Sequence, residues 1–352
     1  VSQGERKFWY FNGNFNDPQF DRLNMLEMVL GAVIEIQKIS PEAKSVIKDV
    51  FGVNVDELDE AGLETLVSDV LFQQDKNAQR VAETGRLYWY FNGNFADPRF
   101  DRFALLKAIL EATVELRSFS SEAHEIIREV YQIDVNDLDE VTFERLVSDL
   151  LFQMDLHDVD PDRQFWHFNE DFDREPHFDR LRLFEVVLEA SYKMRFNFSS
   201  EAKAVIKQVY LVDLDQPLTP VSYETLVTDI LFQRDFKKLS GGEREFWYFN
   251  NDFNEAPAFD RLTLLERVFE TVYKIQDYSP RAKEVIKDLY DVDVDNLYEM
   301  TLEKLISDVL FQKDLKNISE GRREYWYFNG EFGVTVFDQL NMLELILEAV
   351  AD

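Results

Sequence analysis

The chain has 352 residues, of which 45% are hydrophobic and 14% aromatic, so it can build packed cores and does not resemble a disordered polyanion. Its 38 Lys and Arg residues against 69 Asp and Glu residues give a net charge of −31. This charge disfavours nucleic acid and anionic membranes as partners and favours a basic one, although it also suits solubility or a saline environment. With no cysteine, disulfides, thiolate metal sites and cysteine nucleophiles are excluded.

The sequence contains no run of about eighteen apolar residues, which is what a membrane-spanning helix requires. The residues after Val1 show neither the basic nor the apolar region of a signal peptide. We therefore expect no membrane insertion. A soluble compartment, with the cytoplasm as the default, is the expectation for localisation.

An aromatic signature recurs five times along the chain, first as FWYFNGNF from Phe8 and last as YWYFNGEF from Tyr325. Its tryptophans lie 80, 77, 81 and 79 residues apart. This spacing predicts a tandem array of units of about eighty residues. The units are residues 1–80, 81–157, 158–238, 239–317 and a partial fifth, 318–352, which is either a terminal cap or a truncated copy.

Each unit carries three helix signals in the same order. In the first unit, Asp17-Pro18 begins an apolar stripe that runs from Phe20 to Ile36 and predicts a long first helix. Ser40-Pro41 begins a second helix, which Gly52 ends. After a break over residues 53–60, a third helix passes through residues 66–71, and the aromatic signature that follows is predicted to be extended with a tight turn.

The predicted fold is therefore all-α, a solenoid-like array of units with three helices and a short aromatic segment each. Independent beads remain an alternative, since eighty residues are near the size that folds alone. The junctions favour a stack, because segments such as KLSGGERE before Phe246 contain no long Gly/Ser or Pro tract. The layout resembles HEAT or armadillo arrays in architecture only, since their repeats are shorter and lack this signature.

The Trp and Asn residues of the signature are the first candidate partner-binding site, because an aromatic ring supplies contact area and an amide fixes orientation. A structural interpretation competes, in which the ring fills the junction between units and the amide satisfies backbone groups. The candidate residues are Trp9, Asn12, Trp89, Asn92, Trp166, Asn169, Trp247, Asn250, Trp326 and Asn329.

The arginine of a recurring Phe-Asp-Arg motif is the second candidate, since a guanidinium binds carboxylates in a bidentate manner. The competing interpretation is an internal salt bridge in the first turn of the first helix. The four arginines are Arg22, Arg102, Arg180 and Arg261.

Metal binding and catalysis have weaker signals. The acidic segments NVDELDE from Asn54 and DVDVDN from Asp291 lack the glycine and glutamate pattern of an EF-hand. The four histidines occur only in the second and third units, so they form no recurrent site. The sequence has no phosphate-binding glycine loop and no nucleophile elbow. We therefore predict no catalytic residue, no metal and no cofactor.

A repeated unit suits avidity more than catalysis. The leading hypothesis is a non-catalytic, multivalent scaffold or adaptor that binds copies of a protein partner with a basic surface. One alternative is a carrier or storage protein that holds apolar ligands in aromatic-lined clefts. Another is a hydrolase that uses acidic pairs. The identity of the partner is not encoded in any motif.

Overall fold

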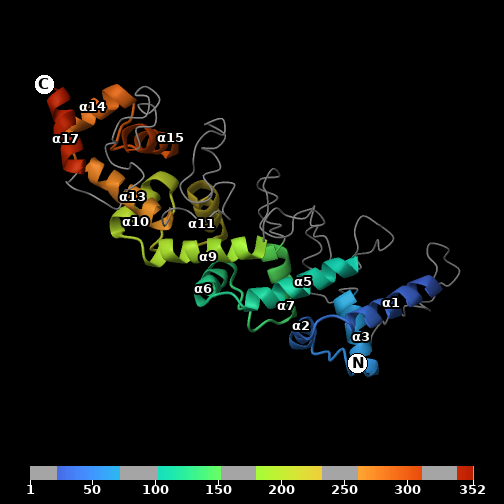
Figure 1. The fold of residues 1–352 in the computed structure, drawn as a ribbon. Helices are drawn as coiled ribbons and strands as arrows, with labels where there is room; N and C mark the ends of the chain where they lie inside the picture. The colour runs from blue at the N-terminus through green and yellow to red at the C-terminus, as the bar shows by residue number, and fades with distance from the viewer. Residues whose placement is uncertain (1–21, 72–101, 152–179, 232–260, 311–338, 352) are drawn as a thin grey trace. The chain divides into compact units, whose positions relative to one another are not determined.

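The computed structural model describes residues 22–71, 102–151, 180–231, 261–310 and 339–351 (Figure 1). Within these ranges every regular element is a helix and no strand occurs, which confirms the all-α prediction for the described part of the chain. The chain divides into two compact units, Val1–Glu185 and Val186–Asp352, and each is described by itself.

Five long helices each follow a Phe-Asp pair and are called the first helices. Those that begin at the arginine of the motif have the apolar stripe that the sequence predicts, with residues such as Val29, Val33 and Ile36 buried in α1. The predicted start at Asp17-Pro18 lies outside the described residues. The first helices are α1 (Arg22–Ile36), α5 (Arg102–Arg117), α9 (Arg180–Phe196), α13 (Arg261–Gln276) and α17 (Gln339–Val350).

Four shorter second helices begin at a serine N-cap, as predicted. In each, the serine hydroxyl accepts a hydrogen bond from the N–H of an alanine three residues later, which satisfies one of the free amides of the helix start. The cap serines are Ser40, Ser120, Ser199 and Ser279. The helices are α2 (Pro41–Phe51), α6 (Ser121–Tyr131), α10 (Ser200–Tyr210) and α14 (Pro280–Tyr290).

Each second helix ends at a residue in the left-handed conformation. Gly52, at φ 70°, does so without strain and donates its N–H to the Lys48 carbonyl, which confirms the predicted stop. The other three copies place Gln132, Leu211 and Asp291 in the same conformation, at φ 56°, 59° and 54°. The left-handed turn therefore does not depend on glycine.

The third helices differ from the single helix that the sequence predicts, because a short α-helix changes into a π-helical turn. In the third copy, the Thr228 hydroxyl donates to the carbonyl of Glu224 four residues earlier, a contact that competes with regular α-helical bonding. The α-helical parts are α3 (Glu60–Thr65), α7 (Glu140–Arg145), α11 (Pro220–Thr225) and α15 (Glu299–Lys304). The π-helical parts are η1 (Leu66–Leu71), η2 (Leu146–Leu151), η3 (Leu226–Leu231) and η4 (Leu305–Leu310).

The cores form where a second helix packs on the next first helix. In one unit α2 packs on α5, and in the other α10 packs on α13 and α14 packs on α17. The last aromatic residue of a second helix contacts the third helix or the first helix that comes next. Phe51 meets Phe143 of α7 edge-on at 5.9 Å between ring centroids, and Tyr210 meets Phe269 of α13 at 6.4 Å.

Candidate functional site

The candidate residues of the aromatic signature all lie outside the described residues, so their role stays a prediction. They are Trp9, Asn12, Trp89, Asn92, Trp166, Asn169, Trp247, Asn250, Trp326 and Asn329. The four arginines of the Phe-Asp-Arg motif begin α1, α5, α9 and α13, but the structure does not describe their side chains. Neither a partner contact nor a salt bridge of Arg22, Arg102, Arg180 or Arg261 is therefore tested.

The described surface with the most regular polar chemistry is the segment between the second and third helices, here called the acidic loop. Its copies are residues 53–59, 133–139, 212–219 and 292–298. The first and third residues of each loop are buried apolar anchors, such as Val53 and Val55, which are 3% and 1% exposed. Because the anchors alternate with polar positions, the polar side chains at the second and fourth positions face outward.

The second residue of each loop forms the same turn in all four copies. A side-chain oxygen of Asn54, Asp134, Asp213 and Asp293 accepts the backbone N–H of the residue two positions later, at 3.0–3.3 Å. The carbonyl of the same residue accepts an N–H from three positions later, at 3.1 Å in every copy. An aspartate or asparagine side chain therefore stabilises this turn in all four copies.

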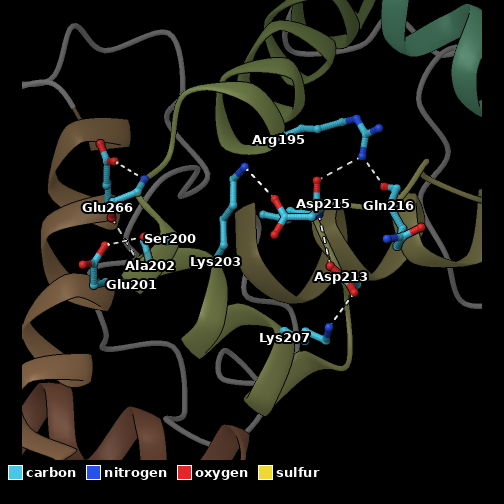
Figure 2. A network of polar contacts seen from close by, with 12 residues as sticks. Arg195, Ser200, Glu201, Ala202, Lys203, Lys207, Asp213, Asp215, Gln216 and Glu266 are labelled. Carbon is cyan, nitrogen blue, oxygen red and sulfur yellow. Dashed lines mark hydrogen bonds and ion pairs between the residues drawn. The ribbon is translucent and has the colours of Figure 1, made fainter. Parts of the chain in front are cut away.

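The end of the first helix holds the third loop residue in place. The side chains of Gln37, Arg117, Arg195 and Gln276 each donate a hydrogen bond to the carbonyl of Val55, Val135, Leu214 and Val294, at 2.9–3.1 Å. Figure 2 shows the third copy, where Arg195 also donates to the carbonyl of Gln216. These bonds tie each acidic loop to the first helix of its own repeat.

A lysine of the second helix pairs with the fourth loop residue in three copies. The Nζ to Oδ1 distances are 2.7 Å for Lys44 and Asp56, 3.0 Å for Lys203 and Asp215, and 2.7 Å for Lys283 and Asp295. The lysine side chain is mostly covered while the aspartate stays open, at 16% against 70% exposure for Lys203 and Asp215. The carboxylate is thus the more exposed partner of the pair, and Figure 2 shows Lys203 and Asp215.

The second copy replaces both members of this pair. His124 stands at the lysine position and Asn136 at the aspartate position. His124 Nε2 lies 2.8 Å from the Leu116 carbonyl and so joins the second helix to the first. Because both positions change together, we interpret the Lys–Asp pair as part of the loop architecture.

A second ion pair shifts the titration of the loop in the third and fourth copies. Lys207 Nζ donates to Asp213 Oδ2 at 2.6 Å, which lowers the pKa of the Asp213 carboxyl and raises the pKa of the Lys207 ammonium. Lys287 and Asp293 repeat the arrangement at 3.0 Å with the same pKa directions. Arg128 and Asp134 form a looser pair of 3.3 Å in the second copy.

A glutamate on each of three first helices accepts a bond from the preceding serine cap, a contact that sequence reasoning missed. Glu185, Glu266 and Glu344 accept the backbone N–H of Ser120, Ser199 and Ser279 at 2.8–2.9 Å. Figure 2 shows Glu266. A carboxylate at a helix N-terminus is stabilised by the free amides and the helix dipole. The sequence does carry a signal for this contact, because a glutamate stands six residues after the aspartate of the Phe-Asp pair. In α5 the same position is occupied by Lys107.

In the part of the chain that the structure describes, no group of three or more His, Asp or Glu residues could hold a metal ion. The acidic segments that raised the question of calcium use their oxygens for turns and lysine pairs. His157, His167 and His177 lie outside the described residues. None of the described helices is long and apolar enough to cross a membrane.

The described residues form an all-α structure with a hydrogen-bonded, carboxylate-bearing loop in each of four places. No protein-family model, no curated protein and no solved structure matches the chain. What the loops can do chemically follows from their residues. They accept hydrogen bonds and ion pairs, and the aspartates that lysines support keep an open face toward solvent.

Proposed function

We propose that the chain is a non-catalytic, multivalent scaffold in which units of about eighty residues stack and bind copies of a protein partner through a basic surface. One observation carries the proposal. All four acidic loops have the same turn, the same buried anchors and the same hydrogen bond from the end of the first helix. A net charge of −31 supports the choice of a basic partner.

The loops favour binding because their backbone is already ordered. A partner that contacts Asp56, Asp215 or Asp295 meets side chains that are 57–70% exposed on a fixed turn, so little conformational entropy is lost in the loop. A single exposed ion pair contributes at most about 1 kcal/mol. Several such contacts on one chain raise the apparent affinity when the partner itself presents several basic patches.

The fifth loop position is charged in two loops and neutral in the other two, although all four have the same turn. Glu57 and Asp137 occupy it in the first two copies, whereas Gln216 and Asn296 occupy it in the other two. The turn is the same in all four, so a neutral residue is compatible with the loop. The double variant Glu57→Gln/Asp137→Asn therefore removes loop charge with residues that the array already accepts.

The test is affinity capture with the full chain from its native source, followed by native mass spectrometry of the complex. We expect more than one copy of a basic protein per chain, released by salt, and weaker capture by the loop double variant. The matched control is Glu42→Gln/Glu284→Gln, which removes the same charge from exposed positions on α2 and α14. Equal loss in both variants, a solvent-extractable apolar ligand, or substrate turnover would contradict the proposal.

A further inference from the structure

An apolar side chain is exposed just after the acidic loop, at the second residue beyond it, in three of the four copies. Val141, Val221 and Met300 occupy this position and are 44%, 74% and 51% exposed. In the first copy the residue is Ala61, which is also exposed. Single apolar residues are common on protein surfaces, but here the same position is open in every copy. The exposure is therefore a regular feature of the four loops and does not depend on the place of the copy in the chain.

The third helix itself explains why this position faces outward. In α11, Val221 is 74% exposed, whereas Tyr223, two residues later, is fully buried. Two residues of an α-helix that are two positions apart differ by about 200° around its axis, so they lie on opposite faces. The same contrast holds for Val141 and Phe143 of α7. The helix thus buries one side chain in the core and holds the other in solvent.

The third loop has a second exposed apolar residue, directly before its first buried anchor. Leu211 is 86% exposed and has a φ of 59°, a conformation that is sterically unfavourable for leucine. The other copies hold Gly52, Gln132 and Asp291 here, and all three are exposed. Leu211 therefore contributes little to the stability of its own chain, and its side chain is open to contact by another molecule.

The third loop is also the least acidic of the four. Counted with the one residue before it and the two after it, this loop has two carboxylates, whereas each of the other three has four. Asp213 is paired with Lys207 at 2.6 Å, and Asp215 is the more open of the two, with 70% of its side chain exposed (Figure 2). The third loop thus combines one open carboxylate with an exposed apolar residue at either end, Leu211 and Val221.

We propose that the exposed apolar residues beside the acidic loops contact an apolar side chain of the basic partner, and that Leu211 and Val221 form the main contact of this kind. The inference rests on the proposed function and names the kind of segment that the loops recognise. Such a segment carries an aliphatic side chain between lysines or arginines. Its cations meet Asp215 and the open carboxylates of the other loops, while its aliphatic side chain covers Leu211 or Val221. Charge alone accepts any basic segment, whereas the apolar contact selects among them.

Two synthetic peptides test the proposal, one with a leucine between two pairs of lysines and one with a serine in its place. Each peptide is immobilised, and binding of the full chain is measured by biolayer interferometry in low salt. The wild type should bind the leucine peptide about fivefold more tightly, which corresponds to burial of roughly 40 Å² of apolar surface. Leu211→Gln/Val221→Ala, which uses the residues of the second and first copies, should remove most of this preference without weakening binding of the serine peptide. Adding Val141→Ala/Met300→Ala should remove the remainder.

Two controls separate this contact from folding and from general hydrophobicity. Leu211→Gly should also reduce the preference, although glycine adopts the left-handed conformation without strain and the variant should be at least as stable as the wild type. Leu345→Ala removes a side chain that is 65% exposed on α17, outside the acidic loops, and should keep the preference.

The outcomes distinguish this inference from the proposed function. Equal binding of the two peptides by the wild type, weakened by Glu57→Gln/Asp137→Asn, would overturn the apolar contact and leave the proposed function standing. A preference for leucine that Leu211→Gln/Val221→Ala retains in full would overturn the assignment of the contact to the third loop. No binding of either peptide in low salt would overturn both.

Discussion

Two leucines at the same place in two of the first helices provide a test of which contacts stabilise the fold. Leu110 of α5, the helix that packs on α2, is 1% exposed, whereas Leu30 of α1 is 47% exposed. Leu110→Ala removes a fully buried side chain and leaves a cavity, so we expect a loss of about 3–5 kcal/mol. Leu30→Ala removes a side chain that water already reaches on one side, so we expect about 1 kcal/mol.

The measurement is urea unfolding followed by far-ultraviolet circular dichroism, at a concentration where the chain is monomeric. Because repeat units can unfold separately, hydrogen exchange of the α2 and α5 amides should accompany it and report the local effect. Leu110→Ala is expected to speed exchange in both helices, since each covers the other. Equal losses for the two variants would refute the view that the interface between a second helix and the next first helix is the stabilising core.

Three further predictions concern the caps and loops. Leu211→Gly should stabilise the chain by about 0.5–1 kcal/mol in thermal unfolding, because Leu211 is 86% exposed at φ 59° and buries little there, while glycine adopts this conformation without strain. Lys207→Met should raise the pKa of Asp213 toward its ordinary value of 3.8 in a carbon-13 NMR titration, because the lysine hydrogen bond lowers it. In the wild type, the stability from this shift is present above pH 3.8 and is lost as the pH falls through the lowered pKa. Lys203→His with Asp215→Asn, the pair present in the second copy, should destabilise less than the sum of the single variants in a double-mutant cycle, and an additive result would contradict a structural role for the pair.

The helix starts and stops were largely predictable because each has a local cause. Ser40 caps α2 and Gly52 ends it through contacts within a few residues, and such contacts leave a signature in the sequence. Leu211 ends its helix in the same left-handed conformation, which the propensity of leucine does not indicate, whereas Asp291 is a residue type that tolerates it. Each of them is followed by a buried anchor of the acidic loop, such as Val212, which is 2% exposed.

The chemistry of the acidic loop was harder to predict, because its partners are distant in sequence. Lys44 meets Asp56 across twelve residues, and Gln37 meets Val55 across eighteen. From the sequence alone, the clustered oxygens raised the question of calcium binding. Only the packing of the helices shows that lysine side chains pair with several of these carboxylates. The joint change to His124 and Asn136 was a visible signal of the pair. The aromatic signature, the strongest pattern in the sequence, lies outside the described residues.

Some carboxylates of the four loops take part in the fold, and others are not required by it. Asp213 and Asp293 shape the turn and accept lysine, so their charge is largely matched within the chain. The fifth position holds Glu57 and Asp137 in the first two loops and the neutral Gln216 and Asn296 in the last two. The turn is the same in all four, so the fold does not require a charge at this position. If the loops bind a basic partner as proposed, the charge at this position should contribute to the affinity, because the fold does not require it. Adding it through Gln216→Glu/Asn296→Asp should therefore strengthen partner binding in low salt, and unchanged binding would separate the acidity from the function of the loops.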